Sequence, residues 1–398
     1  MYYLQNNIEI ISGFKRFCAY DFNTKKMYSL DLDAMNILKN IVDNNDAEKL
    51  IMHNDIGKYF WTEGMVVTKN NLVPKIDIPT YNFRVDFAWI EVTQNCNLIC
   101  RHCYEESSRA ERKREMSLND FKKTIDELID LGVKRIQLVG GEPLMHSQIE
   151  NLIDYVAGKF IYIEIYTNGT MLTDKLLDIV KENNISLAMS IYSEENEVHD
   201  YVTRTRGSLV LTKKSIKKAL DKQIPIRLAS VEMKDVPSFQ LNSFDVPFRT
   251  DLPRLTGRAD LSLYSKDMLK RKLIKKETFS RPISIEEFYK NKTIHNCYGE
   301  RLYIDCELNI YPCAMERRIC YGNSSGKHIS KIVHDQFAKL TKDKIDGCKD
   351  CEYRYACYDC RCDANSAQIN AKPWYCTYDQ EKGVWVNEDE FINDLLNK

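Results

Sequence analysis

The sequence has no feature of a membrane-spanning, secreted or strongly charged protein. It contains no apolar run of the about 18 residues that a membrane span needs, and its start lacks the basic region and apolar core of a secretory signal. Lysine and arginine (57 residues) balance aspartate and glutamate (58 residues), so a net charge of −1 favours neither nucleic acid nor a membrane as a partner. No repeat or low-complexity segment stands out. The 398 residues are enough for two or three globular domains.

Cysteine is the residue that the chain has in excess. Of 14 cysteines, Cys18 stands alone, three lie between 96 and 103, and ten lie between 297 and 376. A short secreted protein would use so many cysteines for disulfides, but this chain is long and shows no export signal, so metal binding is favoured. Exposed iron clusters are sensitive to oxygen, and we therefore expect a reducing, anaerobic cytoplasm.

The first cluster, Cys96, Cys100 and Cys103, has the spacing Cys-x3-Cys-x2-Cys directly after the apolar run 87–92. A cubane 4Fe–4S cluster takes four ligands, so three thiolates leave one iron open for a cofactor or a substrate. Two other interpretations are half of a zinc site, although structural zinc takes four ligands, and three unrelated buried thiols.

Residues 84–235 alternate between strand and helix patterns, which predicts an α/β fold with a parallel sheet and right-handed crossovers. In barrels of this type, function lies on the loops that follow the strands. Three such loops carry polar or glycine-rich motifs: the cysteine loop, Gly140-Gly141-Glu142-Pro143, and Thr167-Asn168-Gly169. The predicted strands are 87–93, 135–139, 161–166, 187–191 and 224–231, and the predicted helices are 118–130 with Ser117 as N-cap, 149–160, 174–181 and 209–221.

The first 83 residues contain no plausible metal site. Strand patterns at 8–11, 17–20 and 27–30 precede helical patterns at 32–42, 47–52 and 55–61, which is typical of a small winged-helix-like module. Such a segment is either a binding module or a packing extension. After Val231 the pattern weakens, apart from a basic amphipathic helix expected over 266–276.

The triad and the Gly-Gly-Glu-Pro turn together resemble the radical S-adenosylmethionine (SAM) superfamily. The resemblance implies that the three thiolates hold a 4Fe–4S cluster, that SAM chelates the open iron, and that the glycine-rich turn meets its amino group. Reduction then cleaves SAM, and a 5′-deoxyadenosyl radical abstracts hydrogen from the substrate. Further SAM contacts are implied for His102, which would stack on the cofactor, and for Asn168, Gly169, Ser190, Arg204 and Arg206.

The C-terminal cysteines resemble the SPASM domain, which carries auxiliary clusters. By position, the resemblance implies an outer 4Fe–4S cluster on Cys348, Cys351, Cys357 and Cys376, and an inner one on Cys297, Cys313 and one of Cys360 and Cys362. Cys306 and Cys320 could be a ligand, a spare thiol or a thiol facing the substrate. The alternative is a pair of zinc knuckles.

Two positions depart from the SPASM pattern. Leu308 stands where a glycine is usual, and Ala314 stands where sulfatase-maturing members carry an aspartate. The second departure argues against a sulfatase-type maturase. The remaining expectation is a radical oxidoreductase that modifies a ribosomally made precursor peptide, forming a thioether or another cross-link, or epimerising a residue. From a different class, the chain could be a non-catalytic iron–sulfur scaffold that binds peptides.

The expected organisation has four parts. These are a leader-recognition module (1–83), which would bind the leader peptide by strand addition, a partial (β/α)6 TIM-like barrel (84–240), the barrel end with a linker (241–290), and the SPASM domain (291–398). The expected partners are the precursor peptide, an electron donor such as flavodoxin or ferredoxin, and an ATP-grasp ligase, because the front of the chain is similar to maturases paired with such ligases.

Overall fold

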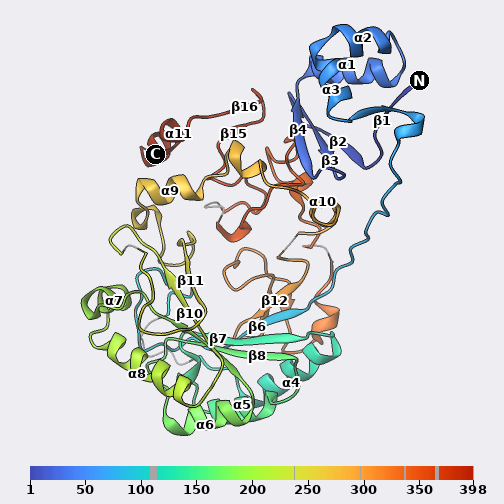
Figure 1. The fold of residues 1–398 in the computed structure, drawn as a ribbon. Coiled ribbons are helices and arrows are strands. Elements are labelled where there is room, and N and C mark those ends of the chain that lie inside the picture. Colours follow the sequence, from blue (N-terminus) through green and yellow to red (C-terminus); the bar gives the residue numbers. More distant parts are fainter. Residues whose placement is uncertain (108–113, 237, 296, 336–337, 364–366, 398) are drawn as a thin grey trace.

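The structure is a computed structural model that describes residues 1–107, 114–236, 238–295, 297–335, 338–363 and 367–397. Its body is an open α/β half-barrel, and an extended connection joins this body to a separate lobe formed by the start of the chain (Figure 1). The cysteine-rich C-terminal segment lies between the half-barrel and the lobe. In the described part of the chain, none of the helices has the length and apolar character needed to span a membrane.

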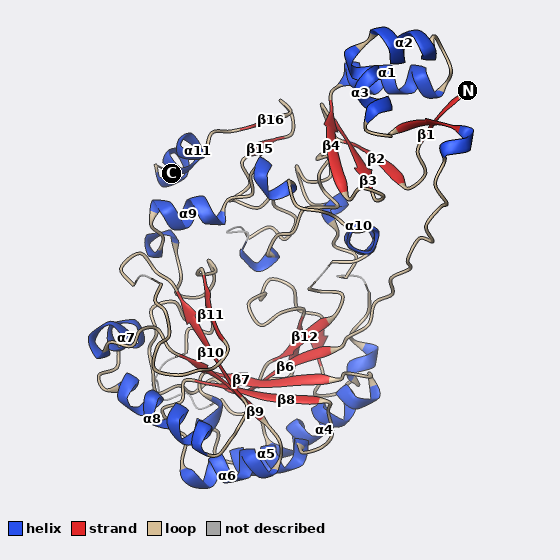
Figure 2. Ribbon diagram, in the orientation of Figure 1, coloured by secondary structure: helices blue, strands red, loops and turns tan. Residues whose placement is uncertain are grey.

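Six parallel strands in chain order form the wall of the half-barrel, which confirms the expected fold class. Helices in the crossovers cover its outer face (Figure 2). The strands are β6 (Phe87–Thr93), β7 (Arg135–Gly140), β8 (Tyr162–Thr167), β9 (Ser186–Ser190), β10 (Ile226–Val231) and β11 (Phe248–Asp251). The helices are α4 (Leu118–Asp130), α5 (Ile149–Val156), α6 (Asp174–Glu182), α7 (Asn196–Thr203) and α8 (Ser208–Asp221).

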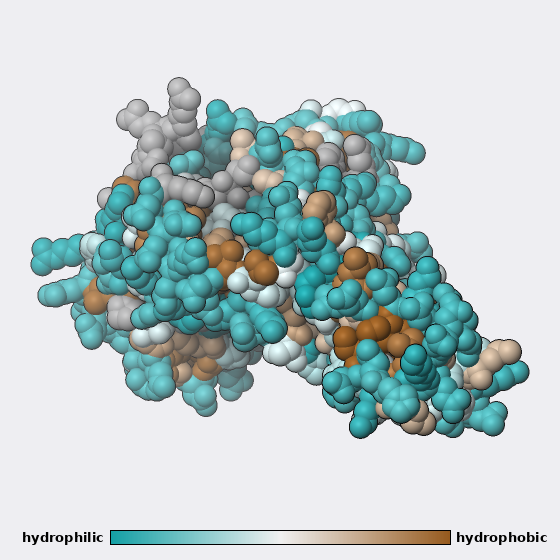
Figure 3. Space-filling model, turned by 90° about the horizontal axis from the view of Figure 1, so that it is seen from above, coloured by the Kyte–Doolittle hydropathy of each residue, from teal (hydrophilic) through white to brown (hydrophobic). Residues whose placement is uncertain are grey.

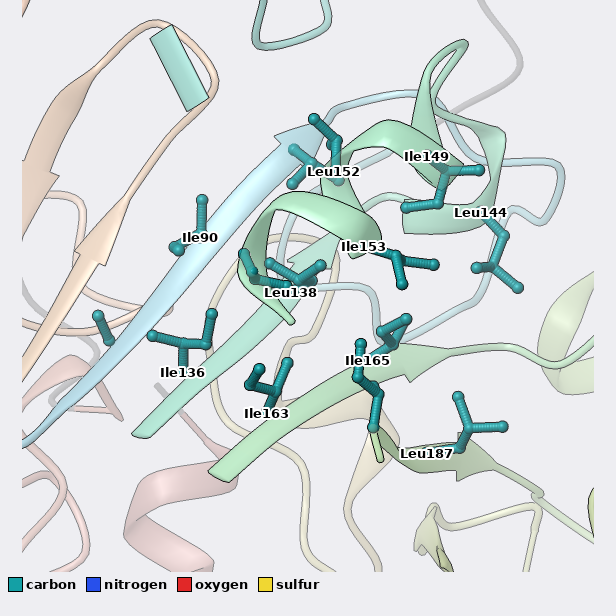
Figure 4. Close-up of a cluster of buried hydrophobic side chains, with 14 of the residues drawn as sticks. Ile90, Ile136, Leu138, Leu144, Ile149, Leu152, Ile153, Ile163, Ile165 and Leu187 are labelled. Carbon is teal, nitrogen blue, oxygen red and sulfur yellow. The ribbon is translucent and has the colours of Figure 1, made fainter. Parts of the chain in front are cut away.

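The outer face of the sheet is aliphatic because it packs on the helices. Ile90, Leu138 and Ile165 come from neighbouring strands and contact the layer that contains Leu152 and Ile153 of α5 (Figure 4). All five side chains are fully buried, and each contributes roughly 1.5–3 kcal/mol of hydrophobic stabilisation. This packing fixes which strand residues point inward, toward the lumen of the half-barrel.

The cysteine-rich segment continues the same sheet. β12 (Arg301–Ile304) pairs in parallel with β6, and β13 (Asn309–Tyr311) and β14 (Gly322–Asn323) follow antiparallel. The sheet therefore has nine strands in the order β11-β10-β9-β8-β7-β6-β12-β13-β14. Because β6 leads into the cysteine loop, this pairing brings the C-terminal segment next to Cys96, Cys100 and Cys103.

The front lobe has a three-stranded antiparallel sheet in the order β2-β3-β4, so that β4 is an edge strand. Three short helices pack on it around Leu38, Ile41 and Phe60. The elements are β1 (Tyr2–Leu4), β2 (Ile8–Ser12), β3 (Phe17–Asp21), β4 (Lys26–Leu30), α1 (Leu32–Val42), α2 (Ala47–His53), α3 (Asp55–Thr62) and β5 (Val66–Thr68), which pairs with β1.

Several boundaries differ from the sequence predictions. Helix α5 ends at Val156 rather than at 160, because Gly158 adopts φ +70°. Helix α9 (Lys266–Lys272) stops before 276, where Ile274 forms a bridge with Cys376. Helix α7 was not predicted, and β11 lies in the segment expected to contain the barrel end and a linker. The remaining elements are α10 (Ile285–Thr293), β15 (Tyr378–Asp379), β16 (Val384–Trp385) and α11 (Glu388–Leu396).

Candidate metal and cofactor site

The loop that follows β6 is held against the end of α7. Ile99 and Arg101 donate their backbone N–H groups to the carbonyls of Thr203 (3.1 Å) and Val202 (3.0 Å). These bonds hold the cysteine loop at the carboxyl edge of the parallel strands, where the loops of such barrels meet.

The three thiols of this loop are free and act electrostatically on one another. Burial raises the pKa of Cys96 to about 12 and also raises the pKa of Cys100. A cluster that binds here must therefore displace thiol protons. Three soft sulfur donors on one loop fit an iron–sulfur cluster.

Arg258 supports the cysteine loop from a segment more than 150 residues away. Its Nε donates to the carbonyl of Cys100 (2.9 Å), and both Nη atoms donate to the carbonyl of Ser107 (3.0 Å). Burial dominates the pKa of Cys100, but the positive charge of Arg258 acts in the opposite direction. Gly257 (φ +57°) packs so closely that a Cβ would lie 2.4 Å from the carbonyl oxygen of Cys103. No motif in the sequence predicts this support.

The glycine-rich turn after β7 packs directly on the start of the cysteine loop. The N–H groups of Gly141 and Glu142 donate to the carbonyls of Thr93 (2.9 Å) and Asn95 (2.7 Å). A Cβ on Gly140 would lie 2.2 Å from the Thr93 carbonyl oxygen, and a Cβ on Gly141 would lie 2.4 Å from that of Asn95. Both positions therefore require glycine, which lets the two loops form one continuous backbone surface.

The side chain of Glu142 braces neighbouring strands. Its carboxylate accepts hydrogen bonds from the Thr167 hydroxyl (2.6 Å), the Asn168 N–H (2.7 Å) and the Leu144 N–H (3.2 Å). Complete burial raises the pKa of Glu142 to about 7. Pro143 begins the short 3₁₀ turn that follows. Because these hydrogen bonds occupy the carboxylate, only the backbone of Glu142 is left for the cofactor contact that the sequence predicts.

A polar network joins the loop after β8 to the cysteine loop. The Asn168 amide donates to Asn97 Oδ1 (2.9 Å) and accepts from the Thr170 N–H (2.9 Å), and Asn97 donates to the Thr170 hydroxyl (2.7 Å). At the end of β9, the Ser190 hydroxyl lies 3.3 Å from the Tyr166 hydroxyl. The expected residues Asn168, Gly169 and Ser190 therefore lie in adjacent loops around the triad.

The basic residues near α7 divide into exposed and buried ones. Arg204 and Arg206, which were expected to pair with a carboxylate, are both exposed. Arg101 is more enclosed: its guanidinium stacks on Tyr201 (4.3 Å), and in the described residues its Nη1 is buried with no hydrogen-bond partner. His102 is half-buried beside Tyr192, with ring centroids 4.9 Å apart. Arg101 is thus a candidate that the sequence motifs did not single out.

The C-terminal cysteines group into two sets of four. Cys357 acts electrostatically on the other three cysteines of the outer set, which contains Cys348, Cys351, Cys357 and Cys376. In the inner set, the sulfur atoms of Cys360 and Cys362 lie 3.2 Å apart, and the Cys313 and Cys362 thiols share a hydrogen bond. Cys297 interacts electrostatically with Cys313 and Cys360. The hydrogen bond from Cys362 lowers the pKa of Cys360.

Two cysteines lie outside both sets. Cys306, which was predicted as a metal ligand, donates its N–H to Glu91 (3.4 Å) and lies in the aliphatic core, where the charges of Glu91, Asp305 and Glu307 act on its thiol. Cys320 is exposed, and its thiol donates to the carbonyl of Gly322 (3.7 Å). The inner set therefore contains both Cys360 and Cys362, and neither set contains Cys306 or Cys320.

A buried acidic cluster that the motifs did not predict lies where β6 meets β12. The Tyr303 hydroxyl contacts Glu91 and lies 2.9 Å from Glu105, and Arg317 pairs with Glu105 (2.5 Å). Burial and the charge of Glu91 raise the pKa of Glu105. Ala314 packs against Tyr303 in the same region, so carboxylates are present next to the position where sulfatase-type maturases carry an aspartate.

Comparison with known families finds that residues 90–233 match the model described as the Radical SAM superfamily. The chain is 39% identical over 144 residues to the antilisterial bacteriocin subtilosin biosynthesis protein AlbA of Bacillus subtilis (strain 168). It is 27% identical over 172 residues to a GTP 3′,8-cyclase of Desulforamulus reducens. These alignments cover 36% and 42% of this chain but only 32% and 53% of those two proteins.

Solved structures share the fold over most of the chain. Streptococcus suis SuiB bound to S-adenosylmethionine matches with a TM-score of 0.55 and 14% identity, covering 93% of this chain and 98% of SuiB. The structure titled native anSMEcpe with bound AdoMet matches with a TM-score of 0.53 and 16% identity, covering 78% of this chain and 98% of that one. At these identities the likeness concerns the fold.

Proposed function

Since residues 90–233 are a radical SAM domain, we propose that the chain is an oxidoreductase that modifies a ribosomally made precursor peptide. The observation that carries the proposal is that the Cys96–Cys103 loop, the Gly140–Pro143 turn and the Asn168 loop share one edge of the sheet. When bound there, a 4Fe–4S cluster and SAM supply a 5′-deoxyadenosyl radical that abstracts hydrogen from an unactivated C–H bond.

The chain's own groups have separate tasks in this proposal. Cys96, Cys100 and Cys103 hold the cluster, and Arg258 keeps their loop in place. Glycines at 140 and 141 let the turn pack against the cysteine loop, so that both loops can present their backbone to the cofactor. Asn168, Ser190 and Arg101 orient its polar groups, while the buried aromatic side chains nearby exclude water. The acidic cluster around Tyr303 would face the substrate.

We extend the proposal to two auxiliary clusters, one on each set of four cysteines. Two groups of four free thiols supply the full ligand count for two cubanes, and this supports the assignment. Because four protein thiolates leave no iron open for a substrate thiolate, the clusters would carry an electron away from the substrate radical. A low-potential flavodoxin or ferredoxin would reduce the enzyme, and an ATP-grasp ligase remains a predicted partner.

Our proposal that a peptide is the partner rests on a groove of about 790 Å³ beside the edge strand β4. Tyr28 and Leu30 of β4 and Ile56 and Tyr59 of α3 line it. An edge strand offers unpaired backbone groups to an extended peptide, and an apolar groove beside it selects side chains. SuiB, which shares the fold, has been solved bound to its precursor peptide SuiA, which supports a peptide as the partner.

The test is SAM cleavage by the anaerobically reconstituted chain. We expect about 12 irons per chain and formation of 5′-deoxyadenosine with dithionite, measured by mass spectrometry. Cys100→Ala should lose about four of these irons and all product. Cys320→Ala is the matched control and should behave as the unmodified chain. Candidate peptides encoded beside this gene should acquire a mass change.

Three outcomes would contradict the proposal. Zinc in place of iron would favour zinc knuckles. An iron-loaded chain that forms no 5′-deoxyadenosine, with or without a candidate peptide, would favour the non-catalytic scaffold. Equal product from Cys100→Ala would remove the triad from the reaction.

A further inference from the structure

The front lobe is joined to the loop that carries the outer cysteine set. We call residues 348–357 the outer loop. The Phe14 N–H donates to the carbonyl of Asp350 (2.8 Å), and Arg354 Nη1 donates to the carbonyl of Ser12 (2.8 Å). Asp350 and Arg354 lie on either side of Cys351. The turn between β2 and β3 therefore rests directly on the loop that would bind iron.

The centre of this joint is Glu352, the residue after Cys351, which is fully buried. Its carbonyl accepts a hydrogen bond from the Tyr20 hydroxyl of β3 (2.8 Å), and its carboxylate accepts one from the Tyr378 hydroxyl (2.6 Å). A Cβ on Gly13 would lie 2.9 Å from the Glu352 backbone nitrogen. The lobe and the outer loop are thus packed without spare space, and a shift of one displaces the other.

The outer loop contributes Tyr353 to the second wall of the β4 groove, and β15 and β16 contribute the rest of its aromatic side chains. One wall comes from the lobe, including Tyr28 and Tyr59, and the other comes from the C-terminal segment, including Tyr353, Tyr378 and Trp385. Tyr353 lies two residues after Cys351, and Tyr378 lies two residues after Cys376. Both tyrosines of this second wall therefore lie on the same stretches of backbone as cysteines of the outer set.

The groove has the chemistry of a site for an extended peptide. Its lining is mostly aromatic and aliphatic, with Arg16 and Lys276 as basic groups and Asp31 and Asp55 as acidic groups. Seen from above, a patch of apolar side chains lies on the right-hand part of the molecule, on the side of the front lobe (Figure 3). Tyr59, which lines the groove, is 48% exposed and is therefore accessible to a partner.

We propose that an iron–sulfur cluster on the outer set completes the second wall of the groove, so that the peptide site forms only when this cluster is present. The proposal rests on the auxiliary clusters and the peptide partner of the proposed function. Described residues of the outer loop form turns and no helix or strand. Such a loop lacks a ladder of backbone hydrogen bonds, and metal ligation supplies its order instead.

Hydrogen exchange on the full chain tests the proposal without any peptide. The Cys351→Ala/Cys376→Ala variant should lose about four irons and should exchange the β4 amides (residues 26–30) at least about tenfold faster. Cys100→Ala is the matched control: it also loses a cluster, but β4 should exchange as in the unmodified chain. The amides of α5 report on the barrel and should not change in either variant.

A second variant separates the joint from the cluster. Tyr378→Phe removes the hydroxyl that bonds Glu352 and should speed β4 exchange several-fold while the iron content stays unchanged. Unchanged β4 exchange in the double cysteine variant would overturn the proposal, and so would faster exchange throughout the chain with no effect of Tyr378→Phe. A reconstituted chain without iron on the outer set would instead overturn the proposed function, and iron analysis makes that outcome distinguishable.

Discussion

Replacing Asp359 with asparagine should destabilise the cysteine-rich segment strongly, because its negative charge lies between two buried cations. Asp359 accepts hydrogen bonds from Lys342 Nζ and from Arg361 Nε (2.7 Å). The side chains of Asp359 and Arg361 are 1% exposed and that of Lys342 is 10% exposed. Asp359 also lies between Cys357 and Cys360 in the sequence, so the ion triad joins the outer and the inner set.

The size of the effect follows from desolvation. Breaking a buried ion pair by removing one partner costs about 3–5 kcal/mol, since the remaining charge stays out of water without compensation. In Asp359→Asn two like charges remain, and the shape of the side chain is kept, so the loss is electrostatic. Because the segment shares its sheet with the half-barrel, the scaling for larger domains applies, roughly 2–4 °C per kcal/mol, and Tm should fall by at least about 6 °C.

The assay is thermal unfolding of the anaerobically reconstituted chain, with iron content measured in parallel. Glu150→Gln is the matched control, because Glu150 also pairs with a lysine, Lys175, at 2.7 Å, but on the surface, with side chains 41% and 71% exposed. The control should cost less than about 1 kcal/mol. Lys342→Met combined with Asp359→Asn should lose less than the sum of the single changes, by roughly 1–3 kcal/mol. Equal losses in Asp359→Asn and Glu150→Gln would refute the argument from burial.

Three further predictions concern the barrel. Arg258→Gln should lower iron retention on the triad, measured by iron analysis, because each charge-assisted hydrogen bond is worth about 1.5–3 kcal/mol; retention equal to the unmodified chain would contradict the support role. Gly257→Ala should lower Tm much more than Gly207→Ala does, because both glycines have positive φ but only a Cβ at 257 would meet the Cys103 carbonyl, at 2.4 Å. Equal losses of Tm would mean that backbone strain alone explains the effect. Burial lowers the pKa of His199 to about 4 from its usual 6.5, so the unfolded state binds the extra proton between these values and the free energy of unfolding should fall as pH drops from 6.5 to 4, by up to roughly 3 kcal/mol. His199→Gln should flatten this slope in urea titrations, and an unchanged slope would contradict the assignment.

Local signals were sufficient for much of the barrel. The run 87–93 is strand β6, and Ser117 caps α4 by accepting the Asp120 N–H, both as predicted. These elements have strong periodicity or a cap, which act over a few residues. Helix α7 lacks such a signal: its N-terminal residue has no side-chain cap, and its face contains His199 and Thr203.

The partners of the site residues could not be predicted in the same way. Arg258 meets Cys100 across 158 residues of chain, and Tyr20 meets Glu352 across 332. No local pattern encodes such distances, because they depend on the pairing of β12 with β6 and on how the lobe packs.

The sequence by itself determined the kind of chemistry that this protein can support: ligand type and spacing are local properties, and three cysteines on one loop after a strand favour an open cluster over a closed zinc site. Only the tertiary structure decided that Cys360 and Cys362 gather together in the inner set, that the Glu142 carboxylate braces strands, and that the front lobe rests on the outer loop. These features arise from long-range packing, in which burial and charge compensation depend on residues far apart in the chain.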